Sequence, residues 1–160
     1  MQHIAILAVG RLKEKYLTVG VGEYLKRVSP YAKVALYEVE DEGIPDNPSP
    51  DARRKVREKE GARLLNHLRP GTFLVALDKN GESRSSEEMA ALLDELALAG
   101  RNDLTFVIGG SLGLSPEIVR RADLRLSFSQ LTFPHQLFRL ILLEQLYRWF
   151  KISRSEPYHK

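Results

Sequence analysis

Cysteine is absent from this chain of 160 residues. Its absence excludes a disulfide framework, a thiolate metal site and a cysteine nucleophile. Long hydrophobic runs are absent as well, since the longest apolar stretches fall far short of the ~20 residues that a membrane-spanning helix needs. The opening residues, MQHIAILAVG, have no basic leader and are typical of a strand rather than a signal peptide. We therefore expect a cytoplasmic protein that contacts no membrane.

Several well-known site motifs are also missing. The chain has no G-x-G-x-x-G spacing, no Gly-Lys-Ser/Thr sequence and no G-x-S-x-G elbow. Its four histidines include no pair with metal-ligand spacing. These absences argue against a Rossmann dinucleotide site, a P-loop and a serine hydrolase, and we expect no metal site.

Charge is nearly balanced, with 24 basic and 21 acidic residues, but it is unevenly distributed. Basic residues gather in 53–63 and in the final segment, whereas acidic residues gather in 38–46. A basic surface of this kind can bind a polyanion such as RNA. The simpler interpretation of 53–63 is a solvated helix face, because charge runs on helices are common.

Strand and helix patterns alternate along the chain, and length and composition favour a single domain spanning 1–160. The expected strands are Gln2–Val9, Lys33–Glu40, Thr72–Leu77, Leu104–Ile108 and Leu124–Phe128. The expected helices are Glu14–Val28, Pro50–Leu68, Glu87–Ala99, Pro116–Arg121 and Pro134–Lys151. Ser49-Pro50 predicts a helix start, and the Ser85/Glu88 spacing predicts a capping box. The pattern predicts an α/β fold with a mostly parallel sheet covered by helices on both faces.

Three predicted strand ends carry unusual residues: Leu77-Asp78, Gly109-Gly110 and the run Phe128–Phe133. In a parallel sheet these ends meet at one edge, where ligands bind. Glycine pairs allow a backbone to approach a ligand closely. The polar and apolar residues of Phe128–Phe133 suit an adenine-like ring. Each feature also has a plain interpretation, a tight turn for GGSLG and an ordinary strand-to-helix connection for Phe128–Phe133.

The predicted last helix is apolar nearly all round, which indicates burial on most sides. A second subunit is one natural cover, and packing within the monomer is the other. His135 and Arg139 lie on one side near its start, next to the expected ligand. His135 is either a structural histidine or a usable base. The turn-rich loop Asp41–Pro50 is typical of a mobile segment beside a site.

These segments together resemble one family. FVIGGSLGLSPEI, LSFSQLTFPHQLFRLILLEQLYRWFKI, the terminal PYHK, the early VGRLK and EYLKR, and REKEGARLL are similar to the ribosomal RNA large subunit methyltransferase H family of the SPOUT superfamily. The resemblance covers essentially the whole chain, and its C-terminal motifs are highly specific in combination.

The resemblance implies a C-terminal trefoil knot, a homodimer and an S-adenosylmethionine pocket. It places that pocket at eight residues of this chain: Leu77, Gly109, Phe128, Ser129, Gln130, Leu131, Thr132 and Phe133. It implies methylation of N3 of a pseudouridine in large-subunit (23S) ribosomal RNA, on the assembled ribosome, and requires no metal. Knots are rare, and no spacing in the sequence predicts one.

Our mechanistic hypothesis assigns roles to residues at the C-terminal end. His135 acts as base or hydrogen-bond donor, and Arg139 stabilises the forming anion. Tyr158 and His159 close over the target base from the same or the partner subunit. Arg154 and Lys160 hold RNA phosphate. The competing interpretations are a non-catalytic RNA-binding or ribosome-assembly factor and an α/β domain for another nucleotide such as NAD; binding of S-adenosylmethionine separates them.

Overall fold

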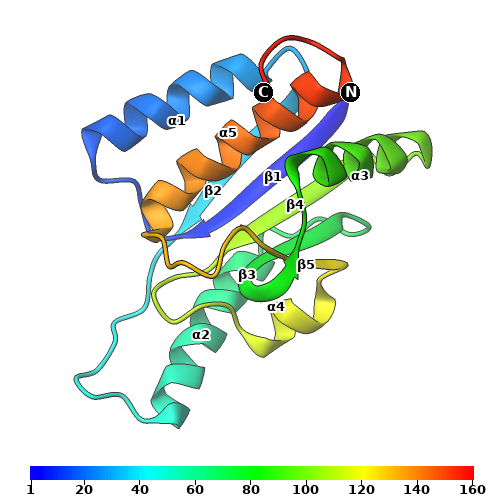
Figure 1. The fold of residues 1–160 in the computed structure, drawn as a ribbon. Helices are drawn as coiled ribbons and strands as arrows, with labels where there is room; N and C mark the ends of the chain where they lie inside the picture. Colours follow the sequence, from blue (N-terminus) through cyan, green and yellow to red (C-terminus); the bar gives the residue numbers. More distant parts are fainter.

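Five strands form one fully parallel sheet in the order β2-β1-β4-β3-β5. The computed structural model describes all residues, 1–160. The strands are β1 (Gln2–Val9), β2 (Ala32–Val39), β3 (Phe73–Ser83), β4 (Asp103–Ile108) and β5 (Leu124–Ser127). Because every pair is parallel, all the carboxyl ends lie at one edge of the sheet (Figure 1). The predicted parallel α/β sheet is confirmed.

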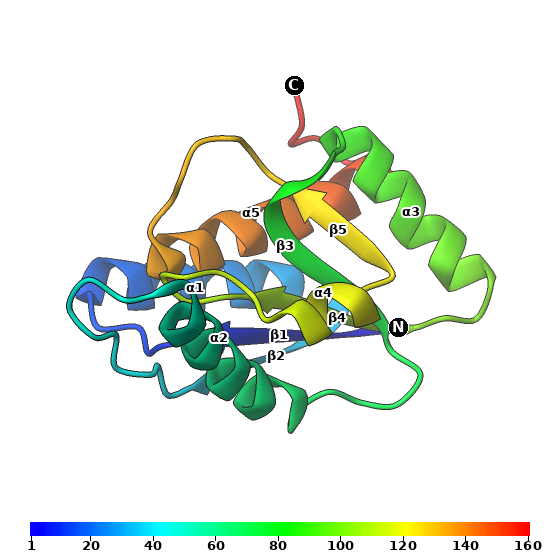
Figure 2. The same ribbon diagram turned by 90° about the horizontal axis from the view of Figure 1, so that it is seen from below.

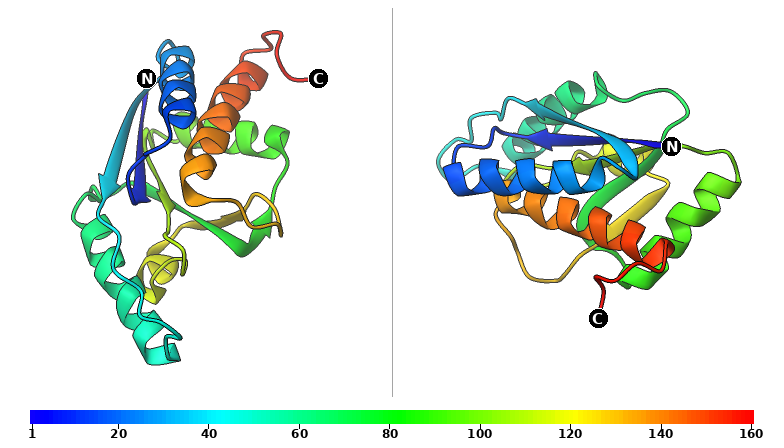
Figure 3. Two further views of the ribbon diagram at one scale, coloured as in Figure 1. Left: turned by 90° about the vertical axis from the view of Figure 1, so that its left-hand side faces the viewer. Right: turned by 90° about the horizontal axis from the view of Figure 1, so that it is seen from above.

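Helices cover both faces of the sheet. One face carries α1 (Lys15–Val28), α3 (Ser86–Leu98) and α5 (His135–Ser153), with α1 and α5 side by side (Figures 1 and 3). The opposite face carries α2 (Pro50–Leu65) and α4 (Pro116–Arg121), as the view from below shows (Figure 2). The predicted covering of both faces is therefore confirmed.

Alternation along β1 explains the two layers. Ile4, Ile6 and Ala8 face the layer of α1, α3 and α5, whereas the residues between them face α2 and α4. Successive side chains of a strand point to opposite faces, so a strand buried on both sides is apolar throughout. This is why Ile4–Val9 form one continuous apolar run.

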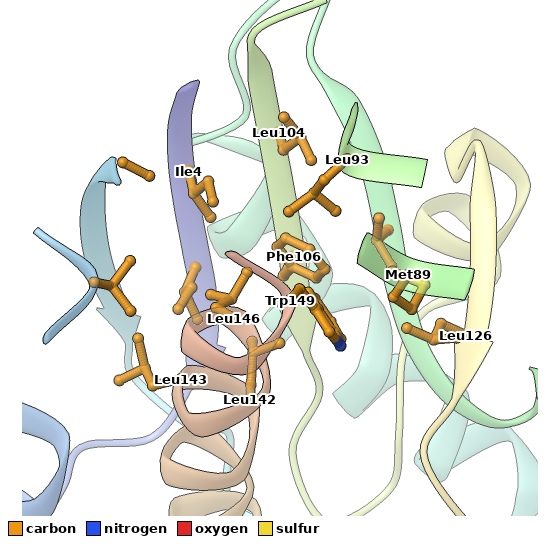
Figure 4. Close-up of a cluster of buried hydrophobic side chains, with 14 of the residues drawn as sticks. Ile4, Met89, Leu93, Leu104, Phe106, Leu126, Leu142, Leu143, Leu146 and Trp149 are labelled. Carbon is orange, nitrogen blue, oxygen red and sulfur yellow. The ribbon is translucent and has the colours of Figure 1, made fainter. Parts of the chain in front are cut away.

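Helix α5 is the main cover of the first face. Leu142, Leu143, Leu146 and Trp149 are almost completely buried and meet Phe106 of β4 in the core (Figure 4). A large-to-small change at such a position typically costs ~2–5 kcal/mol. The other side of α5 stays half-exposed, at Leu137 and Ile141 among others.

Local signals place the helix starts where the sequence predicts them. The Ser49 side chain accepts a hydrogen bond from the Ala52 amide at 3.1 Å, with Pro50 at the first helical position. Ser85 and Glu88 form the predicted capping box. Several predicted ends shift by one to three residues, which is the usual scatter at frayed termini.

One predicted boundary is wrong. The third strand was expected to end at Leu77, but β3 continues to Ser83, so Asp78–Gly81 lies within it. The pairing with β5 shifts there, because Leu126 pairs with both Leu77 and Glu82. A Cβ on Gly81 would lie 2.5 Å from the Arg125 carbonyl oxygen, so only glycine fits. The extra residues bulge toward the carboxyl edge, as bulges beside functional sites often do.

Candidate functional site

A cavity of about 580 Å³ lies at the carboxyl edge, over the ends of β3, β4 and β5. Its size is within the range of small-molecule pockets, and its position is where parallel sheets bind ligands. The lining combines the end of β3, the glycine turn after β4, the connection from β5 to α5 and parts of α2 and α4. The three strand ends picked out from the sequence therefore do meet at one cavity.

Seven of the eight residues expected to bind a cofactor line this cavity: Leu77, Gly109, Phe128, Ser129, Leu131, Thr132 and Phe133. Gln130 is exposed and is not part of the lining. His135 lines the same cavity. The structure thus brings together residues that are far apart in the chain.

The glycine turn after β4 is tightly closed. The Gly113 amide donates to the Gly110 carbonyl at 3.0 Å, and Gly113 has a φ of +86°. A Cβ on Gly109 would lie 2.7 Å from the Gly113 carbonyl carbon. The turn therefore needs glycine at 109 for space and at 113 for its backbone conformation.

Behind this turn lies Glu60 of α2, which is 4% exposed. Its Oε2 accepts from the Glu42 amide at 3.0 Å, and its Oε1 has no hydrogen-bond partner. Burial raises the pKa of Glu60. A Cβ on Gly110 would lie 3.0 Å from its Oε1, so the carboxyl group packs directly against the turn. Glu60 thereby joins the loop after β2 to the cavity wall.

The connection Phe128–Phe133 is held by its own side chains and by aromatic contacts. Ser129 Oγ accepts from the Leu131 amide at 2.9 Å. The rings of Phe128 and Phe133 both pack against Phe138 of α5. Leu131 lines the cavity yet is 73% exposed, so an apolar side chain stands at the mouth.

His135 is partly shielded at the start of α5. Burial lowers its pKa, and the positive charge of Arg139 lowers it further, while Asp41 acts in the opposite direction. The imidazole is therefore neutral at neutral pH and able to accept a proton. Gly10, at the end of β1, brings the backbone close, since a Cβ there would lie 3.3 Å from His135 Nε2.

Arg139 lies beneath the cavity rather than in it. Its side chain is fully buried, pairs with Glu38 and donates to the Val9 carbonyl at 2.7 Å. Burial lowers the pKa of this guanidinium despite the pairing. Arg139 thus ties α5 to the ends of β1 and β2 and acts on the cavity through the field it exerts on His135.

Residues missed by the sequence analysis complete the rim. The β3 bulge supplies Lys79 and Asn80 next to the expected Asp78, and α2 supplies Arg57. Burial has the largest single effect and raises the pKa of Asp78, but the Arg125 guanidinium at 2.7 Å, the Asn80 amide and the charge of Lys79 together lower it, so the net pKa is lowered. Lys79 and Asn80 were missed because the strand was expected to end at Leu77. Arg57 was missed because the sequence does not distinguish it from the other basic residues of 53–63.

The chain terminus lies at the other end of α5. Tyr158 donates to Glu144 at 3.0 Å, and His159 contacts Arg148 Nη1 at 3.1 Å through Nδ1 and Glu87 at 2.6 Å through Nε2. Arg154 lies over the Tyr31 ring at 4.9 Å from its centroid. The exposed Lys160 and these tail residues do not line the cavity.

No group of three or more His, Asp or Glu side chains is placed to hold a metal ion. No helix is both long enough and apolar enough to cross a bilayer.

Comparison with known proteins yields a family match and close relatives. The model described as "Predicted SPOUT methyltransferase" matches residues 2–159. The chain is 67% identical over 159 residues to a protein of Pelotomaculum thermopropionicum, covering 99% of both chains. It is 59% identical over 160 residues to a protein of Desulforamulus reducens, covering all of both. Both relatives carry the name ribosomal RNA large subunit methyltransferase H.

Solved structures agree on the fold. A TrmH/SpoU tRNA modifying enzyme of A. aeolicus matches with a TM-score of 0.52 and 19% identity, over 100% of this chain and 82% of the other. A probable methyltransferase from Bordetella pertussis matches with a TM-score of 0.51 and 12% identity, over 91% and 95%. At such identities these structures support the fold alone.

Proposed function

Because the chain belongs to the SPOUT methyltransferase family and is a methyltransferase, we propose that it methylates N3 of a pseudouridine in large-subunit ribosomal RNA on the assembled ribosome, in the cytoplasm. The methyl donor is S-adenosylmethionine, which supplies a methyl group activated by positive sulfur. The observation that carries the proposal is the convergence of Leu77, Gly109 and the Phe128–Phe133 connection on one cavity.

The cavity fits this donor in size and chemistry. Its volume of about 580 Å³ suits a nucleoside with an amino-acid arm. Apolar walls formed by Leu77, Ile108 and Leu126 suit the faces of an adenine ring. The glycine turn and the Phe128–Phe133 connection expose main chain, which can read the ring edge through hydrogen bonds.

His135 is the group we assign to the proton on the target nitrogen. A pseudouridine N3 lies between two carbonyl groups and loses its proton before it can attack a methyl group. The lowered pKa of His135 keeps the imidazole neutral, so it can accept that proton. Arg139 contributes by keeping His135 neutral and by fixing the start of α5, rather than by touching the anion, because it is buried and paired with Glu38.

The tail reaches a cavity only across a dimer. Helix α5 has 19 residues, so its ends lie ~28 Å apart. The cavity lies at its start and the tail at its end. Two copies related by a two-fold axis across α5 run antiparallel there, which brings each tail near the partner's cavity. The half-exposed apolar side of α5 suits such an interface, with Tyr158 and His159 over the base and Arg154 and Lys160 on phosphate.

We also propose that the last third of the chain is threaded as a trefoil knot. Strand β5 lies at the sheet edge beside β3, whereas α5 returns to pack on α1 and α3 and contacts β4. The connection from β5 to α5 therefore crosses the carboxyl ends of the inner strands. Such a crossing is what a trefoil knot requires, because the end of the chain then passes through a loop formed by earlier residues.

The basic segment 53–63 lends little support to a purely RNA-binding function. Arg54, Lys55, Lys59 and Arg63 are all ion-paired with carboxylates. The helix is thus largely the solvated, self-neutralised face that the simpler interpretation predicts. A methyltransferase without a strong basic surface needs other contacts, and the assembled ribosome can supply them.

The deciding experiment follows methyl transfer from labelled S-adenosylmethionine. The substrates are intact ribosomes, naked large-subunit RNA and ribosomes that lack the pseudouridine. We expect label only on intact ribosomes that contain it. Label on ribosomes that lack the pseudouridine would refute the proposed target base. Failure to bind S-adenosylhomocysteine would refute the proposed cofactor.

A further inference from the structure

Arg57 stands apart from the other basic residues of α2. Its four neighbours Arg54, Lys55, Lys59 and Arg63 pair with Asp51, Glu58 or Glu42. Arg57 makes no ion pair and no side-chain hydrogen bond, although it is half-buried and lines the cavity. Arg53, the remaining cation, is exposed and does not line the cavity.

The carboxylates near the cavity make no ion pair with Arg57. Glu60, three residues further along α2, packs on Gly110 and accepts the Glu42 amide. Asp78 on the rim pairs with Arg125. A partly dehydrated guanidinium without an anionic partner is unfavourable, because it loses water without a replacement. The cavity thus presents an unmatched positive charge.

We propose that Arg57 binds the carboxylate of the methyl donor's amino-acid half, a specificity-determining contact that rests on the proposed function. Arginine suits this role because its planar fork matches a carboxylate with two parallel hydrogen bonds. The half-buried position inside the cavity favours a small ligand over an RNA phosphate, which exposed cations such as Arg53 would meet first. Arg57 then selects donors and products that retain the carboxylate.

A ligand-and-variant cycle tests the contact. Isothermal titration calorimetry compares S-adenosylhomocysteine with its decarboxylated analogue on the wild type, Arg57→Gln, Arg57→Lys and the matched control Arg53→Gln. We expect Arg57→Gln to weaken S-adenosylhomocysteine roughly tenfold or more, the loss typical of a charge-assisted hydrogen bond. The decarboxylated analogue should bind Arg57→Gln and the wild type with equal affinity. The affinity of Arg57→Lys for S-adenosylhomocysteine should lie between those of the wild type and Arg57→Gln. Arg53→Gln should bind both ligands as the wild type does.

Four results would overturn the inference. Equal binding of S-adenosylhomocysteine by Arg57→Gln and the wild type removes the carboxylate contact while leaving the proposed function intact. The same holds if Arg57→Gln changes only the salt dependence of the ribosome KM, because Arg57 then meets RNA phosphate. If Arg57→Gln binds both ligands more weakly by the same factor, Arg57 maintains the shape of the cavity and does not contact the carboxylate. A wild type that binds neither ligand ends both this inference and the proposed function.

Discussion

The substitution Gly109→Ala tests the glycine turn with a single methyl group. Its Cβ would lie 2.7 Å from the carbonyl carbon and 2.8 Å from the oxygen of Gly113. Those atoms are main chain and cannot rotate away. Since ordinary contact begins at 3.4 Å, the turn has to open by about 0.7 Å. Such overpacking typically costs ~1–3 kcal/mol.

The strain falls on the wall of the cavity that we propose for the methyl donor. If the bound state carries all of it, the affinity for S-adenosylhomocysteine drops ~5–150-fold, because each 1.4 kcal/mol is about tenfold. Strain that is already present in the unliganded protein lowers its free energy of unfolding instead of its affinity. Calorimetric titration and thermal unfolding therefore have to be read together. The bulkier Gly109→Arg fills the cavity and abolishes binding.

Gly22→Ala is the matched control. It lies inside α1, and a Cβ there meets no atom within 4 Å. Alanine in a helix interior is favoured over glycine by ~0.5–1 kcal/mol, so this variant should be slightly more stable with unchanged affinity. Wild-type affinity and wild-type melting for Gly109→Ala would show that the turn tolerates a side chain, and the argument from close approach would fail.

Four further outcomes are expected. Glu60→Gln should have a higher melting temperature than the wild type at pH 8. The pKa of Glu60 is raised in the folded state, so its contribution to stability is present below the unfolded-state pKa and is lost as pH rises through the folded-state pKa. The difference in melting temperature should vanish near pH 4, and a difference independent of pH would contradict the effect of burial on this carboxyl group. The rate of methyl transfer should decrease at acidic pH as His135 becomes protonated, at a pH below the ordinary pKa of histidine. His135→Gln should be much slower, and its rate should no longer show this decrease in a pH–rate profile. Ser85→Ala should lower the free energy of unfolding in urea by ~1 kcal/mol by removing the capping box; an unchanged midpoint would deny the cap a role. Deleting Tyr158–Lys160 should leave a folded dimer with full cofactor affinity but little transfer to ribosomes, and full turnover would exclude the tail from the mechanism.

Local chemistry made most of the fold predictable. Apolar runs with glycine, proline and serine at their ends mark all five strands and five helices, and every bound except the end of β3 falls within three residues of the prediction. The capping box at Ser85 and the start at Ser49-Pro50 depend only on near neighbours. The β3 bulge was missed because its cause lies in β5, where the Arg125 carbonyl excludes a side chain at Gly81.

The site was predictable wherever it follows strand ends and less so elsewhere. Leu77, Gly109 and Phe128–Phe133 share one edge by the logic of parallel strands. Glu60 does not follow a strand end, so this argument does not predict it. Its spacing of four residues from Val56 and Leu64 does place it on the inner face of α2. The buried pairing of Arg139 with Glu38 joins residues 101 positions apart, which no local pattern records.

The order in which the cavity wall appears along the chain has a consequence for biosynthesis. Its lining begins at Arg57 and is finished only at Phe138, within the last helix. A nascent chain still lacking α5 has no complete place for the methyl donor, so ligand can stabilise only the finished fold, by mass action. Donor concentration in the cell would then favour fully assembled molecules over partly folded ones during quality control.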